Sequence, residues 1–184
     1  CLLSAAMNGC DTDTRLRALI DAHRQLLDNT SYDNSALNQQ LARDYEQISA
    51  LLTSISLTQH YSVQQANWLL GMGEYWSCAL LGSIAGNTAC FIDAVDIITL
   101  SDASHIEIDW AATNTAFRRS VLAKSLHQHA IIPGFVAATY AGHRTVLGRN
   151  GSDLSAAIFA KLCNADAMVK WTDVSGIYSA DPSI

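Results

Sequence analysis

One short stretch of the sequence places glycines, a cation and a hydroxyl group directly before an apolar helical pattern. Residues 146–162 read VLGRNGSDLSAAIFAKL, and the loop positions are Gly148, Arg149, Asn150, Gly151, Ser152 and Asp153. A helix N-terminus presents unpaired N–H groups and a partial positive charge, so a glycine-containing loop before it can bind an anion. Arg149 adds a guanidinium that can grip a carboxylate or a phosphate with two hydrogen bonds. The sequence therefore predicts an anion-binding loop at 148–153.

Part of this loop also has a purely structural interpretation. Ser152 suits the N-cap of the helix, and Asp153 suits its first turn, where a carboxylate complements the helix dipole. Capping does not explain Arg149, which favours a binding role for that residue. The loop has neither the Walker A spacing nor the glycine pattern of a dinucleotide-binding turn.

A second polar cluster follows at 170–182, with the sequence KWTDVSGIYSADP. The run AMVKWT is expected to form a buried strand that ends at Thr172 and Asp173 and continues into a shaped loop containing Gly176 and Tyr178. Alone, these residues are typical of turns. Together with the first loop they form a more specific pattern.

The elements that must position these loops alternate along the chain. Apolar residues recur at helical spacing over 14–28 and about 33–57, and further helices are expected at 62–71, 74–86, 110–129 and from the 148–153 loop to about 164. Between them lie extended runs, TACFID, HIEID, AIIPGFVAATY and RTVLG, and the first residues, CLLSAA, look like the end of a strand. This order is typical of an α/β sandwich with a mainly parallel sheet, in which ligands bind at the carboxyl ends of strands.

Composition excludes several classes of protein. The chain has 184 residues, 49% of them hydrophobic, which suits one well-buried domain. Its net charge of −6, with only 11 scattered Lys and Arg, argues against a nucleic-acid partner.

The five Cys lack CxxC spacing and the six His lack ligand spacing, so neither a disulfide framework nor a metal site is expected. Residues 75–92 carry no charge, but Gly82 and Gly86 interrupt them, which favours a helix and a strand over a membrane span.

These motifs together resemble the aspartate kinase branch of the amino acid kinase family. The resemblance is carried by VLGRNGSDLSAA followed by WTDVSGIYSADP. LLSAA resembles the family's second strand and its Ser-Ala turn, GMGEYWSCALL its Gly-Glu helix start, and IIPGFVAAT the strand that enters its central loop. GEYWSCALL with GRNGSD is most similar to the kinase portion of bifunctional aspartokinase/homoserine dehydrogenases, particularly of the methionine-pathway type.

The resemblance implies a three-layer α/β/α sandwich of the carbamate-kinase-like type. It also implies transfer of the ATP γ-phosphoryl group to the β-carboxylate of L-aspartate with Mg²⁺, the first step of lysine, threonine and methionine biosynthesis. Phosphoryl transfer needs mainly positioning and charge neutralisation, which suits a cationic loop. We expect a cytoplasmic enzyme that forms a homodimer or a higher homo-oligomer, with no nucleic-acid or membrane partner.

Roles carry over from the family to matching positions. Arg149 would hold an aspartate carboxylate, Glu74 would meet the ammonium group, and Ser152 would hydrogen-bond the substrate. Ser4 falls on the turn that faces phosphates and substrate, and Asp153 would organise the catalytic lysine. The nucleotide-site positions are Gly148, Gly151, Thr172, Asp173 and Tyr178, and none is a metal ligand. Without the resemblance, Glu74 also suits a first-turn charge that complements a helix dipole.

The chain departs from the family at several points. It lacks the Lys-Phe-Gly-Gly strand, the downstream Ala-Lys-Val segment and the regulatory ACT domains, so we expect residues 1–184 to be a fragment of the kinase domain. Leu154 stands where Tyr is usual and Ser183 where Arg follows Asp-Pro, and the substrate threonine aligns with Cys10 or with Thr12. These losses favour a second hypothesis, a degenerate domain that binds aspartate or nucleotide or mediates assembly without catalysis. Relatives that phosphorylate glutamate, acetylglutamate, carbamate or UMP fit the motifs less well.

Overall fold

A computed structural model describes residues 2–30, 34–102, 105–121 and 129–171. Four helices come first along the chain: α1 (Leu2–Met7), α2 (Asp13–Asp28), α3 (Ser35–Thr58) and α4 (Val63–Ala85). Their apolar faces meet in one cluster, which we call the helical core, whose largest fully buried side chains are Leu16, Ile20, Leu27, Leu41, Ile48, Leu52 and Ile55. Burial of this apolar surface holds the four helices together.

Helix α4 is the element shared by both parts of the molecule. It begins with a capping box, because Ser62 Oγ accepts the Gln65 amide at 3.1 Å and Gln65 Oε1 accepts the Ser62 amide at 2.7 Å. One face contributes large side chains to the helical core: Leu69, Met72, Trp76 and Leu80. The opposite face lies on strands, and glycines there let the helix backbone approach closely. A Cβ at Gly71 would be 2.8 Å from Val136 Cγ1, and one at Gly82 would be 2.9 Å from Phe91 Cβ.

The strands form two small sheets. Strands β1 (Ala89–Phe91) and β4 (His129–Ile131) pair in parallel, with Ala89 opposite His129. The other sheet has the order β3-β2-β5-β6, from β2 (Thr99–Asp102), β3 (Glu107–Ile108), β5 (Val136–Thr139) and β6 (Arg144–Val146). Strands β2 and β5 are parallel, while β2/β3 and β5/β6 are antiparallel. Short 3₁₀ turns, η1 (Gly86–Thr88) and η2 (Ala94–Asp96), flank β1.

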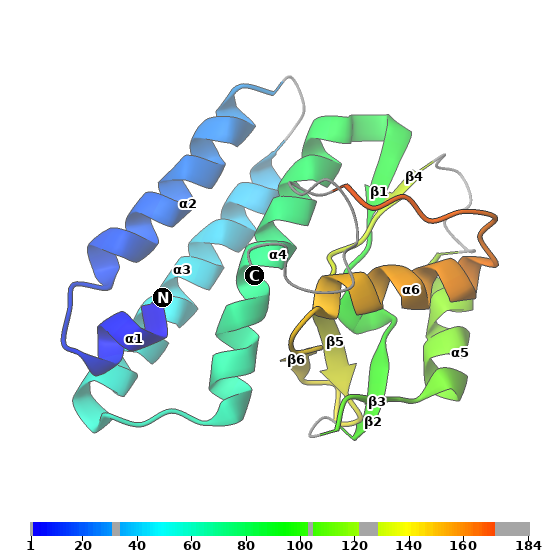
Figure 1. Cartoon of the computed structure of the whole chain (residues 1–184). Helices are drawn as coiled ribbons and strands as arrows, with labels where there is room; N and C mark the ends of the chain where they lie inside the picture. Colours follow the sequence, from blue (N-terminus) through cyan, green and yellow to red (C-terminus); the bar gives the residue numbers. More distant parts are fainter. Residues whose placement is uncertain (1, 31–33, 103–104, 122–128, 172–184) are drawn as a thin grey trace, which may run out of the picture.

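Two further helices cover the other side of the strands (Figure 1). Helix α5 (Trp110–Ser120) contacts β2, and α6 (Gly151–Cys163) contacts β5, whereas α2, α3 and α4 lie on the opposite side. Between them is a second cluster, the sheet core, whose fully buried members include Ile97, Ile98, Leu100, Leu147 and Ile158. Helices on both sides of the strands confirm the expected α/β/α fold, although the strands form two sheets and their pairing is antiparallel as well as parallel.

The remaining helices and strands follow the sequence prediction in part. The helices expected at 14–28 and 33–57 correspond to α2 and α3, and helix α6 ends at Cys163. The expected break between 71 and 74 was wrong, because α4 is continuous through both glycines. The helix expected over 110–129 ends earlier, since α5 stops at Ser120 and His129 already belongs to β4.

Two expected strands are wrong. Residues 2–7 form helix α1, in which Leu3 and Ala6, one turn apart, are buried in the helical core. The segment 167–171 was expected to be a buried strand, but it lies in no strand and its side chains are exposed, Trp171 by 94%. Its apolar composition indicated burial, yet no described strand pairs with it, and a strand requires a partner.

Candidate functional site

The 148–153 loop has a backbone that its residue types explain. Gly148 and Asn150 both lie in the left-handed region, at φ of 66° and 60°, which Gly and Asn adopt at little cost. Asn150 is the N-cap of α6, so Ser152 lies inside the helix and its expected N-cap role was wrong. Because the N-cap is Asn150 and not Ser152, the helix begins two residues earlier than predicted. Asp153 lies in the first turn, as expected.

The start of α6 presents donors and charge to its surroundings. The Gly151 and Leu154 amides bond to the Gly148 and Asn150 carbonyls at 3.0 Å each. The Ser152 and Asp153 amides have no hydrogen-bond partner among the described residues. The side chains of Arg149, Ser152 and Asp153 are exposed. A helix N-terminus with free amides and an adjacent guanidinium suits an anion.

A buried serine holds the loop against the segment that enters β5. Ser155 Oγ accepts the Phe135 amide at 2.8 Å and donates to the Gly151 carbonyl at 2.8 Å, and Ser155 is only 2% exposed. The Leu147 amide donates to the Phe135 carbonyl at 2.7 Å. A Cβ at Gly134 would lie 3.3 Å from Ser152 Cα. The Gly134–Phe135 turn therefore lies directly beside the N-terminus of α6.

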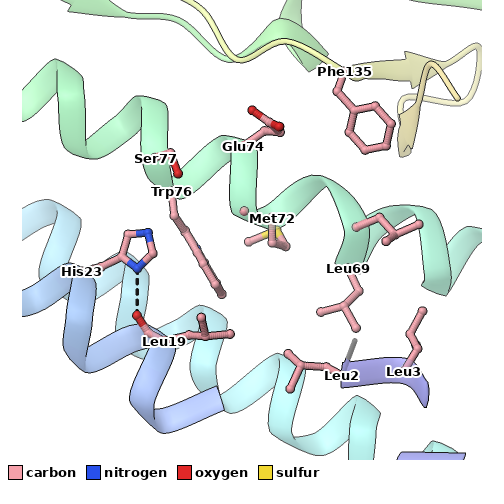
Figure 2. Close-up of a pocket in the computed structure, with 12 residues that line it drawn as sticks. Leu2, Leu3, Leu19, His23, Leu69, Met72, Glu74, Trp76, Ser77 and Phe135 are labelled. Atoms are coloured by element: carbon pink, nitrogen blue, oxygen red, sulfur yellow. Dashed lines mark hydrogen bonds between the residues drawn. The ribbon is translucent and has the colours of Figure 1, made fainter. Parts of the chain in front are cut away.

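Phe135 also borders a cavity of about 390 Å³ that reaches Glu74 on α4 (Figure 2). Most of its walls are apolar and come from α1, α2 and α4: Leu2, Leu3, Leu19, Leu69, Leu70, Met72 and Trp76. Glu74, His23 and Ser77 are its polar members, and Glu74 and Trp76 leave α4 in different directions. Through Phe135, the cavity and the 148–153 loop are neighbours.

Comparison with known proteins identifies the family of the chain. The family model described as "Amino acid kinase family" matches residues 14–184. The chain belongs to the amino acid kinase family.

Among curated relatives, this amino acid kinase domain is 32% identical over 176 residues to bifunctional aspartokinase/homoserine dehydrogenase 2, chloroplastic, of Arabidopsis thaliana, covering 91% of this chain and 19% of that protein. It is 30% identical over 142 residues to bifunctional aspartokinase/homoserine dehydrogenase 2 of Escherichia coli, covering 76% and 17%. It is 33% identical over 129 residues to the aspartokinase of Chlamydia muridarum, covering 68% and 29%. The chain thus spans less than a fifth of the bifunctional relatives.

Solved aspartokinase structures share the fold. Aspartokinase III of E. coli in complex with aspartate and ADP superposes with a TM-score of 0.79 at 29% identity, covering 99% of this chain and 42% of that one. The same enzyme in complex with lysine and aspartate also gives 0.79, at 28% identity and the same coverage. These matches extend over the helical part and the strands alike.

Not all of the predicted site residues of the amino acid kinase domain come together. Glu74 lines the cavity, and Gly134 brings Ser152 near its Phe135 wall. Ser4 lies on α1 next to two cavity residues but is exposed, and its hydroxyl accepts a 3.5 Å hydrogen bond from Asn8 Nδ2. Of the two threonine candidates, Cys10 is exposed, and Thr12 is the N-cap of α2 without a side-chain cap bond. Thr172, Asp173, Tyr178 and Ser183 lie outside the described residues.

Charges around the site are partly paired. Asp153 Oδ2 accepts from Lys170 Nζ at 2.8 Å, an exposed ion pair across 17 positions. Burial, with a further contribution from the charges of Glu74 and Asp93, raises the pKa of the Cys78 thiol to about 11. Burial also raises the pKa of the Tyr75 hydroxyl, with Asp44 and Asp93 adding to the effect.

Sequence reasoning missed several residues that build this site. Phe135 and Ser155 are ordinary apolar and helix positions in the sequence, and their contact spans 20 positions. Lys170 pairs with Asp153 only because the chain returns past α6. A positive φ of 67° at Phe135, rare for an aromatic residue, is a signal that only the structure supplies.

Among the described residues, no group of three or more His, Cys, Asp or Glu could hold a metal ion. Within the same ranges, no helix is both long and apolar enough to cross a membrane.

Proposed function

We propose that this chain is the kinase unit of an aspartokinase, which transfers the γ-phosphoryl group of ATP to the β-carboxylate of L-aspartate. The carrying observation is the junction at Phe135, where the Ser155 hydroxyl holds the cationic 148–153 loop against the wall of the cavity that contains Glu74. A cation with free helix amides on one side and a carboxylate on the other suits an amino acid, which bears both charges.

Each residue then has a separate binding task. The Arg149 guanidinium holds a carboxylate of aspartate, and the free amides of Ser152 and Asp153 add hydrogen bonds to the same anionic region. Glu74, partly buried on α4, receives the ammonium group. The Ser152 hydroxyl orients the substrate. Holding the acceptor carboxylate in line with the phosphoryl donor supplies most of the rate gain in this type of reaction.

The nucleotide is proposed from the family and from the donor set at α6. We propose that the backbone at Gly148 and Gly151 approaches the phosphates. Gly151 is also required by packing, since a Cβ there would be 2.8 Å from Phe135 Cδ2. ATP with Mg²⁺, when bound, supplies the phosphoryl group and neutralises its charge. Asp153, already paired with Lys170, orients an ammonium group at this helix end. We further propose a homo-oligomer in the cytoplasm, by analogy with the family.

Isothermal titration tests the proposal directly. The chain is titrated with L-aspartate and, separately, with a non-hydrolysable ATP analogue and Mg²⁺, for the wild type and for Arg149→Ala and Glu74→Gln. A lost charge-assisted hydrogen bond costs about 1.5–3 kcal/mol, so aspartate affinity is expected to fall by about 10- to 100-fold in each variant. Arg24→Ala is the control, because Arg24 is a partly exposed residue of α2 with an ion pair at 3.7 Å to Asp21 and no predicted role in the site.

The outcomes separate the two hypotheses. Binding of both ligands, with aspartate weakened in the two site variants, supports the kinase site, and ADP release in a coupled assay then establishes turnover. Binding without turnover is the result expected of an intact site without the family's lysine-bearing strand. Failure of the wild type to bind either ligand rejects the proposed site and favours the degenerate domain, to which Leu154 and Ser183 point.

A further inference from the structure

Arg144, the first residue of β6, joins three elements at the interface between α4 and the strands. Its Nη2 forms an ion pair with the Asp93 carboxylate, which follows β1. Its guanidinium carbon lies 5.1 Å from the centre of the Tyr75 ring on α4. The two charged side chains are only 13% and 16% exposed, so this pair is screened by water far less than a surface pair.

The surrounding residues are shaped to this side chain. Gly71 leaves the space, because a Cβ there would be 3.3 Å from Arg144 Cδ. Tyr75 also meets the Phe91 ring of β1 edge-on, with centroids 5.4 Å apart and planes at 82°. We call Gly71, Tyr75, Phe91, Asp93 and Arg144 the arginine cluster. It fixes the position of α4 on the strands by contacts that are polar and directional.

The cluster lies between the two halves of the proposed site. On α4, Tyr75 directly follows Glu74. On β6, Arg144 precedes the 148–153 loop, and Leu147 between them donates its amide to the Phe135 carbonyl. A shift of α4 relative to β6 would therefore change the separation between Glu74 and Arg149.

We propose that Arg144 is a positioning residue that sets the distance between Glu74 and the 148–153 loop. That Glu74 and the 148–153 loop bind a ligand rests on the proposed function. That Arg144 holds α4 against β6 is a property of the fold alone. A lysine would not replace Arg144, because only a planar guanidinium stacks on a ring and bonds to a carboxylate at once. Its Nη1 is buried and has no hydrogen-bond partner within the described ranges, so the Asp93 ion pair and the Tyr75 ring hold the guanidinium here despite the cost of an unpaired donor.

Hydrogen exchange tests this link without any ligand. Peptides covering 70–78 and 148–153 are followed by mass spectrometry in the wild type and in Arg144→Met, Arg144→Lys and Asp93→Asn, with Arg24→Met as control. Exchange in both segments is expected to rise about tenfold in Arg144→Met and in Asp93→Asn. The variant that combines Arg144→Met with Asp93→Asn is expected to show no further rise, because the two residues form one pair. The lysine variant and Asp93→Asn keep the test valid if Arg144→Met does not fold. An unchanged 148–153 segment, or an equal rise in every peptide, overturns the proposal.

Ligand binding separates positioning from general stability. Titration of the folded Arg144→Lys variant is expected to show aspartate affinity reduced about tenfold and the affinity for the ATP analogue unchanged, since only aspartate spans both halves. Equal losses for both ligands would mean that Arg144 acts only through stability. If the wild type binds no aspartate, the proposed function fails, and the exchange experiment alone still decides whether Arg144 couples α4 to the loop.

Discussion

The two faces of α4 are packed in opposite ways. Toward the helical core the helix presents large side chains, and Met72 and Trp76 are each only 4% exposed there. Toward the strands it presents Gly71 and Gly82, so that the backbone itself is in contact with Val136 and Phe91. One face is stabilised by the area that it buries, and the other by close approach and by the pairing around Arg144.

This difference shows how a helix can serve both as a core element and as a frame for a site. The large-residue face is held by apolar contacts, which are not directional. The glycine face is the stricter one, because it adds the ion pair of Arg144 with Asp93 and the contact of Arg144 with the Tyr75 ring, which are directional. Glu74 lies on the turn between Gly71 and Cys78, so it takes its position from the stricter face.

The largest expected effect tests whether the two cores are one unit. Ile48 in the helical core and Ile98 in the sheet core are both fully buried, and replacing either with Ala is expected to cost about 2–5 kcal/mol of unfolding free energy. Because α4 packs against both the helical core and the strands, each variant should lower the urea concentration at which both cores unfold, and by the same amount. Residue-resolved amide signals in NMR give the midpoints separately. Two distinct transitions would show that the faces of α4 fold independently.

The second prediction concerns the junction on the sheet side. Ser155→Ala leaves the Phe135 amide without its partner in the interior, which is expected to cost about 1–3 kcal/mol. Ser152→Ala, at an exposed position of the same helix, should change the unfolding free energy by less than about 0.5 kcal/mol. Urea denaturation measures both. Equal small effects would mean that Ser155 does not hold the loop.

A pair of glycines on α4 gives a smaller and more specific test. Gly71→Ala forces a methyl group to 2.8 Å from Val136 Cγ1, whereas Gly73 has nothing within 4 Å of its Cβ position. Overpacking costs about 1–3 kcal/mol and the better helix propensity of Ala returns about 1 kcal/mol. Gly71→Ala should therefore destabilise by about 1 kcal/mol and Gly73→Ala should stabilise by up to that amount, as thermal unfolding will show. A stabilising Gly71→Ala would mean that the interface between α4 and the strands has room for a methyl group.

The same contrast explains what the sequence could predict. Patterns within one element were readable: the leucine spacing of α2 and α3, and the start of a helix at the 148–153 loop. The prediction divided the helix over 63–85 at Gly71 and Gly73. Gly71 is explained by a partner 65 positions away, Val136, which no local pattern contains. Ser155, Phe135 and Arg144 were missed for the same cause. For residues 167–171 the prediction of a strand was wrong, because their composition indicated a strand but no described strand pairs with them.

The smallest expected effect is chemical, and it probes the strict face of α4 without changing it. Burial raises the pKa of the Cys78 thiol from 9.0 to about 11, so its reactive thiolate at pH 8 is about 100-fold scarcer than in an ordinary cysteine. Cys10 and Cys163 are exposed and should react first with a maleimide, as peptide mass spectrometry will show. The raised pKa means that the folded state holds this proton more tightly, so its contribution to stability is complete below about pH 9 and is lost as the pH rises through 11. If Cys78 reacts as fast as Cys163 in the folded chain, the strand face of α4 is open, and the contrast between its two faces fails.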